Sequence, residues 1–137
     1  MASKVYPKAI ELLNAGTLLW TSDTIRVMLV NASATYNRTH AFVSSVVANE
    51  LTGAARQTLS GKTSADNGTD RWLFDANDPT FTAVTTGQAV GAAIVYKFST
   101  NDAGSPLLAF IDGADLPTNG SDVTVSLPAT GVFYISY

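Results

Sequence analysis

From Thr24 onward, short runs of apolar and strand-forming residues are separated by polar, turn-forming segments, which predicts β-structure. Ile25, Val27 and Leu29 share one face of a segment that begins at Thr24, which predicts a strand buried mainly on that side. Seven further strands are expected in the second half, at residues 56–63, 71–74, 80–84, 92–98, 106–111, 122–127 and 132–136. Short strands at such regular spacing predict a mainly β protein, a single-domain antiparallel β-sandwich or barrel.

Turn-forming residues separate the expected strands. The dipeptides Asn67-Gly68 and Asn119-Gly120 predict tight turns, because both residue types tolerate a positive φ angle. Residues 128–131 are expected to join the last two strands as a hairpin. The turn-rich segments are 64–68, 75–79, 100–104 and 112–121.

A short helix is expected before the first strand. Pro7 suits the first helical position, residues 8–14 contain no β-branched run, and Gly16 suits the position after the helix. Two helical turns are unstable alone, so this helix must dock on its own domain or on a neighbouring subunit. Residues 1–20 are therefore assigned to an N-terminal helix and arm, and residues 21–137 to the β body. Within that body, residues 40–51 favour helix or irregular structure over strand.

Composition excludes several classes of protein. The 137 residues include no cysteine, which excludes a disulfide framework, a thiolate metal site and a cysteine nucleophile. A pI near 4.8 disfavours binding to nucleic acid. Only 14% of the residues are charged, so the surface is expected to be neutral and polar. No leader-like apolar segment and no stretch of about 20 apolar residues occurs, so a soluble protein made without a leader is expected.

The residues that could carry chemistry have simpler interpretations. His40 is the single histidine and no G-x-S-x-G motif accompanies it, which favours a turn or surface role. Asp75 and Asp78 could form an acid–base pair, but aspartates in turns usually bond to nearby backbone N–H groups. The oxygen-rich segments 66–70 and 75–78 could attract calcium, yet neither matches an EF-hand loop. No catalytic, cofactor-binding or metal-ligating residue is predicted.

The aromatic residues leave two interpretations open. Trp72 and Phe74 alternate in one expected strand, and Tyr96 lies in another. Aromatic side chains pack well on pleated sheets, which favours core filling. The alternative is a glycan-binding surface that uses Trp72, Tyr96 and the polar loops.

Several structural motifs cover nearly the whole chain, at residues 8–16, 22–30, 58–63, 74–81, 93–97, 105–112 and 122–125. In these motifs the chain resembles small virion structural proteins of tailed bacteriophages, of the capsid cement or decoration kind. The resemblance implies no catalytic residue, because its motifs are structural.

Residues and resemblance together favour a capsid cement protein. The expected protein is not an enzyme, uses no cofactor, and binds the major capsid protein as a homotrimer on the capsid surface of a virion. It would be made in the cytoplasm of the bacterial host and would bind neither nucleic acid nor membrane. Alternatives are a neck or tail protein, a receptor-binding or glycan-binding fibre module, and, most weakly, a hydrolase that uses aspartate pairs.

Overall fold

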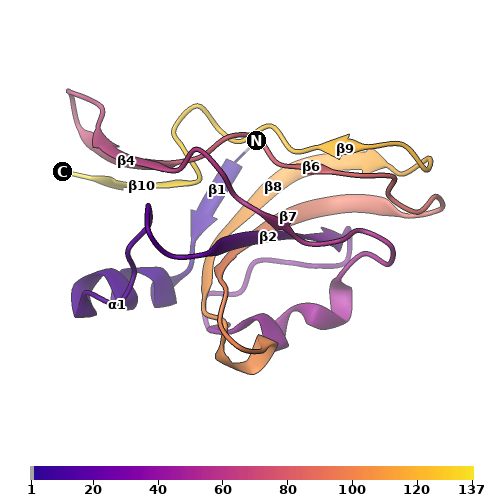
Figure 1. Ribbon diagram of the computed structural model, residues 1–137, viewed down its shortest axis with the longest axis horizontal. Helices are drawn as coiled ribbons and strands as arrows, with labels where there is room; N and C mark the ends of the chain where they lie inside the picture. The colour runs from indigo at the N-terminus through magenta and orange to yellow at the C-terminus, as the bar shows by residue number, and fades with distance from the viewer. Residues whose placement is uncertain (1) are drawn as a thin grey trace.

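The computed structural model describes residues 2–137, with the side chains of all but 2 and 113–117 (Figure 1). Antiparallel strands dominate it, and the largest sheet has five strands in the order β1, β8, β7, β2 and β3. Their bounds are Ala2–Val5, Leu107–Pro117, Ala89–Lys97, Ile25–Asn31 and Gln57–Thr58. The sheet does not close into a barrel, and smaller sheets pack on it, so the expected mainly β, sandwich-like fold is confirmed.

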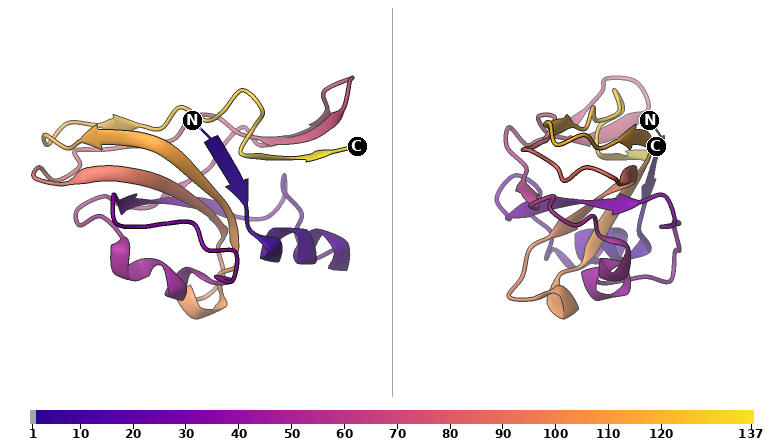
Figure 2. Two further views of the ribbon diagram at one scale, coloured as in Figure 1. Left: turned by 180° about the vertical axis from the view of Figure 1, so that it is seen from behind. Right: turned by 90° about the vertical axis from the view of Figure 1, so that its right-hand side faces the viewer.

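Two smaller sheets face the five-stranded one. A three-stranded sheet has the order β10, β5, β4, and a two-stranded sheet pairs β6 with β9. Their bounds are Phe133–Ser136, Arg71–Asp75 and Thr63–Asp66 for the first, and Thr80–Phe81 and Val123–Thr124 for the second. The two-stranded sheet lies over one face of the five-stranded sheet, and the three-stranded sheet begins over the same face and extends past its end (Figure 2).

The N-terminal helix is confirmed as α1, which spans Pro7–Ala15. Gly16 ends it in the left-handed conformation at φ 72°, where glycine carries no steric penalty. The helix packs against β8 through its buried residue Ala9. Strand β1, which precedes the helix, was not predicted, because its conformation comes from pairing with β8 and its sequence shows no apolar alternation.

The expectation that β2 is buried on one side is wrong, because both of its faces are covered. Val27 and Leu29 face a core shared with the smaller sheets. Met28 and Val30 face a second core beneath residues 32–50, which include the 3-10 helices η1 and η2. Their bounds, Val43–Ser45 and Val47–Asn49, agree with the helical or irregular structure expected for residues 40–51.

Several expected strands are shorter or placed differently. Residues 56–63 contribute the two-residue β3 and, at Thr63, the start of β4, which also includes the expected turn residues 64–66. Leu59 follows β3, still bonds to the Ile25 carbonyl and buries its side chain in the core. Segments 80–84 and 122–127 contribute only β6 and β9, which anchor Phe81 and Val123 in the core.

The C-terminal half differs from expectation in two further respects. Strand β8 continues to Pro117 through a segment expected to be a turn, because β7 extends far enough to pair with it. The expected hairpin across residues 128–131 is also wrong. Strand β9 pairs with β6 whereas β10 pairs with β5, so the last two strands belong to different sheets.

Candidate functional site

The sheet formed by β4, β5 and β10 extends past the end of the five-stranded sheet; we call residues 63–75 and 133–137 the projecting sheet (Figures 1 and 2). Its base is fixed in the core. The rings of Phe74 and Phe133 stack at 4.5 Å between centroids, and Trp20 meets Phe133 edge-on at 5.6 Å. All three side chains are buried, so the sheet is held firmly where it leaves the body.

Beyond the base, β5 and β10 expose apolar side chains on the same face of the projecting sheet, whereas β4 carries the polar Ser64 and Asp66 there. Side chains two residues apart on a strand share a face, so Trp72 and Ile135 continue the row begun by Phe74 and Phe133. Trp72 is 42% exposed and Ile135 is 39% exposed. The described chain exposes seven large hydrophobic side chains, and the projecting sheet carries the four at positions 72, 134, 135 and 137. This is where exposed apolar surface gathers.

Polar contacts keep the outer end of the projecting sheet in shape. The side-chain oxygen of Asn67 accepts hydrogen bonds from the backbone N–H groups of Thr69, Asp70 and Arg71. On the other face of the projecting sheet, the guanidinium of Arg71 lies 4.4 Å from the centre of the Tyr134 ring. These contacts stiffen the hairpin between β4 and β5.

One of these polar contacts joins the end of the chain to β4. The hydroxyl of Tyr137 donates a hydrogen bond to Asp66. This bond lowers the pKa of the Asp66 carboxyl, with help from the Gly68 N–H, and raises the pKa of the Tyr137 hydroxyl. The bond is therefore present at neutral pH and closes the tip of the sheet.

A hollow of about 220 Å³ lies where β1 meets β10. Ser3 and Val5 line it from one side, and Phe133 and Tyr134 line it from the other. The hydroxyl of Ser3 donates a hydrogen bond to the carbonyl of Val132 and ties the two strands together. None of the four lining residues is charged, and two of them, Val5 and Phe133, are apolar, so the hollow offers contact surface.

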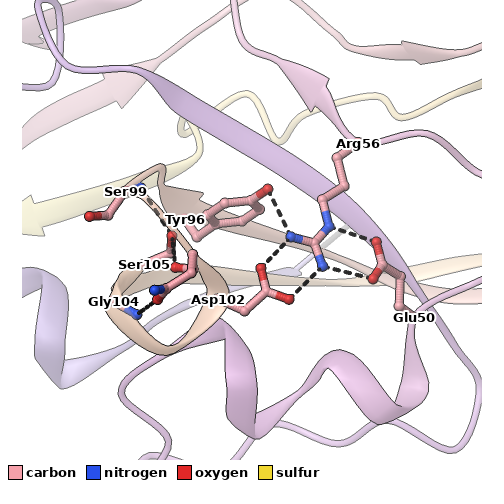
Figure 3. A network of polar contacts seen from close by, with 8 residues as sticks. Glu50, Arg56, Tyr96, Ser99, Asp102, Gly104 and Ser105 are labelled. Carbon is pink, nitrogen blue, oxygen red and sulfur yellow. Dashed lines mark hydrogen bonds and ion pairs between the residues drawn. The ribbon is translucent and has the colours of Figure 1, made fainter.

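The densest polar cluster lies on the other side of the five-stranded sheet, around Arg56 (Figure 3). Its guanidinium donates to both Glu50 oxygens at 2.7 and 2.8 Å, and to Asp102 at 2.7 Å. It also reaches the Tyr96 hydroxyl at 3.4 Å. The cluster therefore ties the end of η2 to the loop before β3, to β7, and to the 3-10 helix η3 at Asp102–Gly104.

The Arg56 cluster is electrostatically self-contained. Its bonds to Glu50 and then to Asp102 raise the pKa of Arg56 above its usual value, and Arg56 in turn lowers the pKa of Asp102. The guanidinium donors are occupied by the carboxylates, and neither a histidine nor a nucleophile joins them. This arrangement clamps the covering segment to the sheet.

The remaining candidate residues bond to the backbone. His40 is half-buried at the end of the turn at 37–40, with its backbone N–H bonded to the Asn37 carbonyl. Asp75 ends β5 and accepts from the neighbouring Ala76 N–H. Asp78 lies in the irregular segment between β5 and β6 and accepts from the Leu127 N–H, 49 residues away, so the expected bond within a turn is wrong for Asp78.

The oxygen-rich turns also use their side chains locally. Asp66 accepts from the Gly68 N–H, and Asn67 caps the hairpin. Among the side chains that the structure describes, no group of three or more histidine, cysteine, aspartate or glutamate residues is placed to hold a metal ion.

Trp72 and Tyr96 do not form a common binding surface. Trp72 is exposed on the projecting sheet, whereas Tyr96 is 1% exposed and lies in the second core. The idea of a glycan platform built from these two rings is therefore wrong. Sequence alternation correctly placed Trp72 on one face with Phe74, but it could not show where along that face the core ends.

No protein-family model matches this chain, and neither the curated proteins nor the solved structures return a significant match. Among the described residues, no helix is long and apolar enough to cross a membrane. The interpretation of function therefore depends on the surfaces described above.

Proposed function

We propose that this protein is a capsid cement protein of a tailed bacteriophage, which binds the major capsid protein and stabilises the shell. The observation that carries the proposal is the end of the molecule formed by α1, the loop after it and the projecting sheet, where six of the seven large hydrophobic side chains that the described chain exposes are found on a firmly anchored support. The described polar clusters, by contrast, are occupied by bonds within the chain. A rigid contact surface fits a protein whose work is binding.

The composition of the surface supports the same proposal. Only 14% of the residues are charged, so few strongly hydrated groups would lose water when the protein docks. Isolated charges can then set the register of a contact without supplying most of its affinity. Many weak contacts of this kind become stable when copies bind a repeating shell, because each attached copy raises the effective concentration of the next contact.

We assign contact with the shell to the helix side of the same end of the molecule. Helix α1 and the projecting sheet extend from the body in the same direction (Figures 1 and 2). Ile10 on α1 is 42% exposed and Leu19 in the following loop is 57% exposed. An apolar side chain this exposed adds little to the stability of the monomer, but it gains burial when it meets a partner.

Binding to purified shells that lack this protein tests the proposal. The wild-type protein should cosediment with shells and raise the temperature at which they rupture. Leu19→Glu should weaken binding at least ten-fold, because it would place a charge in the apolar contact. Val47→Glu is the matched control, since Val47 is 37% exposed on η2, away from α1. Equal binding by both variants would refute the assigned surface, and no binding by the wild-type protein would refute the cement function.

A further inference from the structure

Strand β10 is an edge strand that pairs with β5 alone among the described strands, and its sequence lacks the protection that other edges of this fold have. Strand β1 lies beside the start of β10, where the Ser3 hydroxyl bonds to the Val132 carbonyl. Natural sheets guard their edges with charges, prolines, bulges or very short strands. Strand β1 carries Lys4, and its Val5 carbonyl accepts a bond from the Tyr36 hydroxyl. Strand β3 has only two residues, and β4 ends at Asp66. The sequence of β10, Phe-Tyr-Ile-Ser, contains neither a charge nor a proline.

The ladder with β5 determines which backbone groups of β10 face outward. The N–H of Tyr137 bonds to the carbonyl of Asp70, and Ile135 is the register partner of Trp72. Bonded pairs alternate along an antiparallel ladder, so the odd-numbered residues of β10 direct their backbone groups toward β5. Tyr134 and Ser136 therefore direct theirs toward the open edge.

We propose that this edge pairs with the same edge of a second copy of the chain. In the two-fold antiparallel register centred on Ile135, Tyr134 of each copy is opposite Ser136 of the other. Both residues direct their backbone groups outward, so the two pairs can exchange four hydrogen bonds. The product is a six-stranded sheet that runs from β4 of one copy to β4 of the other.

The side chains favour this register. Ile135 meets its equivalent at a non-hydrogen-bonded position, where side chains on facing strands are closest. Each Trp72 flanks this pair, because Trp72 is the partner of Ile135 on β5. The two exposed apolar side chains of each copy would thus become the centre of one continuous apolar row. The hollow beside Phe133 leaves room for the end of the incoming strand.

Charge does not oppose the contact, although each chain carries a net charge of −3. The row through Ile135 contains one acidic side chain on each copy. This is Asp66 of β4, the register partner of Trp72 of β5. Five strand spacings of about 4.8 Å would separate the two Asp66 residues by about 24 Å. Screening at physiological salt acts over about 8 Å, so their repulsion would be small.

The size of the surface predicts a weak contact in dilute solution. From their exposed fractions, the side chains at positions 72, 134, 135 and 137 offer about 400 Å² per copy. A stable standard-size interface buries about 800 Å² per partner. The dimer should therefore depend on concentration and strengthen when copies are held together on a surface. Only this strengthening rests on the proposed function, because the pairing itself needs no capsid.

Disulfide trapping tests the pairing directly, because the chain contains no cysteine. Facing Cα atoms at a non-hydrogen-bonded position lie about 4.5 Å apart, which is within the range for a disulfide. Ile135→Cys should yield a covalent dimer under mild oxidation, at least ten-fold more than Ile10→Cys, an equally exposed control. Equal yields from the two variants would overturn the proposal.

Charge exchange gives a second test without cysteine. Ile135→Lys should abolish the concentration-dependent dimer in sedimentation, and an equal mixture with Ile135→Asp should restore it. Both variants should remain folded, since Ile135 is 39% exposed. A mixture that stays monomeric would overturn the proposal, and so would a homotrimer that both variants leave intact. Shell binding without dimer trapping would refute the pairing alone, whereas trapping without shell binding would refute only the cement function.

Discussion

Trp72 on β5 stands directly opposite Ile135 on β10, and both side chains continue outward the row in which Phe74 and Phe133 stack in the core. The same strand pair is therefore buried at one end and exposed at the other. The inner end holds the projecting sheet to the body, and the outer end offers a surface for contact. The two ends of this face should therefore contribute differently to stability.

Truncating Phe133 and truncating Ile135 should have very different effects on stability. Phe133 is 2% exposed and stacks on Phe74, so Phe133→Ala should lower the free energy of unfolding by about 3–4 kcal/mol. Ile135→Ala should lower it by less than about 1 kcal/mol, because its side chain already meets solvent. Urea unfolding at low protein concentration measures both. Equal losses would contradict the described boundary between core and contact surface.

Replacing Arg56 should weaken the clamp and change how stability depends on pH. Arg56→Met should cost about 1–2 kcal/mol at pH 7, because the cluster is partly exposed and two carboxylates would lose their partner. Arg56 lowers the pKa of Asp102 in the folded protein. The ionised Asp102 therefore contributes to stability above its unfolded pKa, and this contribution is lost as the pH falls through its folded pKa. The wild-type protein should therefore lose more stability than the variant on acidification below about pH 4.

A surface ion pair provides the control for the Arg56 prediction. Lys8 and Glu11 are 2.8 Å apart, and the Glu11 side chain is 65% exposed. Lys8→Met should change stability by less than about 0.5 kcal/mol and leave the acid dependence unchanged. Urea unfolding at pH 7 and pH 3.5 compares the two variants. A loss for Lys8→Met as large as that for Arg56→Met would contradict the clamp.

Removing the Tyr6 hydroxyl should stabilise the protein. Tyr6 is fully buried, and its hydroxyl has no hydrogen-bond partner among the atoms that the structure describes. Tyr6→Phe should therefore raise the free energy of unfolding by about 1 kcal/mol. Tyr36→Phe is the matched control and should lower it by about 1 kcal/mol, because the Tyr36 hydroxyl donates to the Val5 carbonyl at 2.8 Å. Thermal unfolding of both variants measures the difference.

The Tyr6 substitution should also change behaviour at high pH. Burial, and then the nearby Tyr36, raises the pKa of the Tyr6 hydroxyl above its usual value of 10.0. Because the pKa of Tyr6 is higher in the folded than in the unfolded protein, protonation of the hydroxyl contributes to stability. This contribution is complete below the unfolded pKa and is lost as the pH rises through the folded pKa. Tyr6→Phe should therefore lose less stability than the wild type above about pH 10. Parallel alkaline curves would contradict this account of Tyr6.

Adding a methyl group at Gly91 should disrupt the register of β2 and β7. A Cβ atom there would lie 2.4 Å from the Asn31 carbonyl oxygen, at the irregularity between Val30 and Asn31. Because the obstacle is backbone, Gly91→Ala should cost about 2 kcal/mol or more. Gly104→Ala is the control, since its nearest contact would be 3.4 Å from the Asn101 side chain. Similar urea midpoints for the two variants would contradict the close approach.

The sequence predicted those elements whose local pattern and tertiary role agree. Helix α1 has both of its end signals, and β2, β5, β7 and β10 show clear runs of strand-forming residues. Strand β1 was missed because only its pairing with β8 makes it a strand. The burial of β2 was misjudged because a covering segment without regular pattern lies over Met28 and Val30. Patterns within one strand cannot reveal what a distant segment covers.

The contact surfaces were less predictable for the same reason. The alternation in β5 places Trp72 and Phe74 on the same face and does not distinguish them. Only the contact with Trp20 in the folded chain shows that Phe74 is the ring in the core. The carboxylates that clamp Arg56 come from Glu50 and Asp102, and the second lies 46 residues away. No local motif links residues so far apart.

The number of copies of this chain per virion tests the cement function most directly. Quantitative mass spectrometry of purified particles can measure its ratio to the major capsid protein. Cement bound across the shell predicts a ratio that scales with the number of capsid subunits. A count of about a dozen or fewer per particle, which is typical of a single ring at the neck or tail, would contradict the proposal.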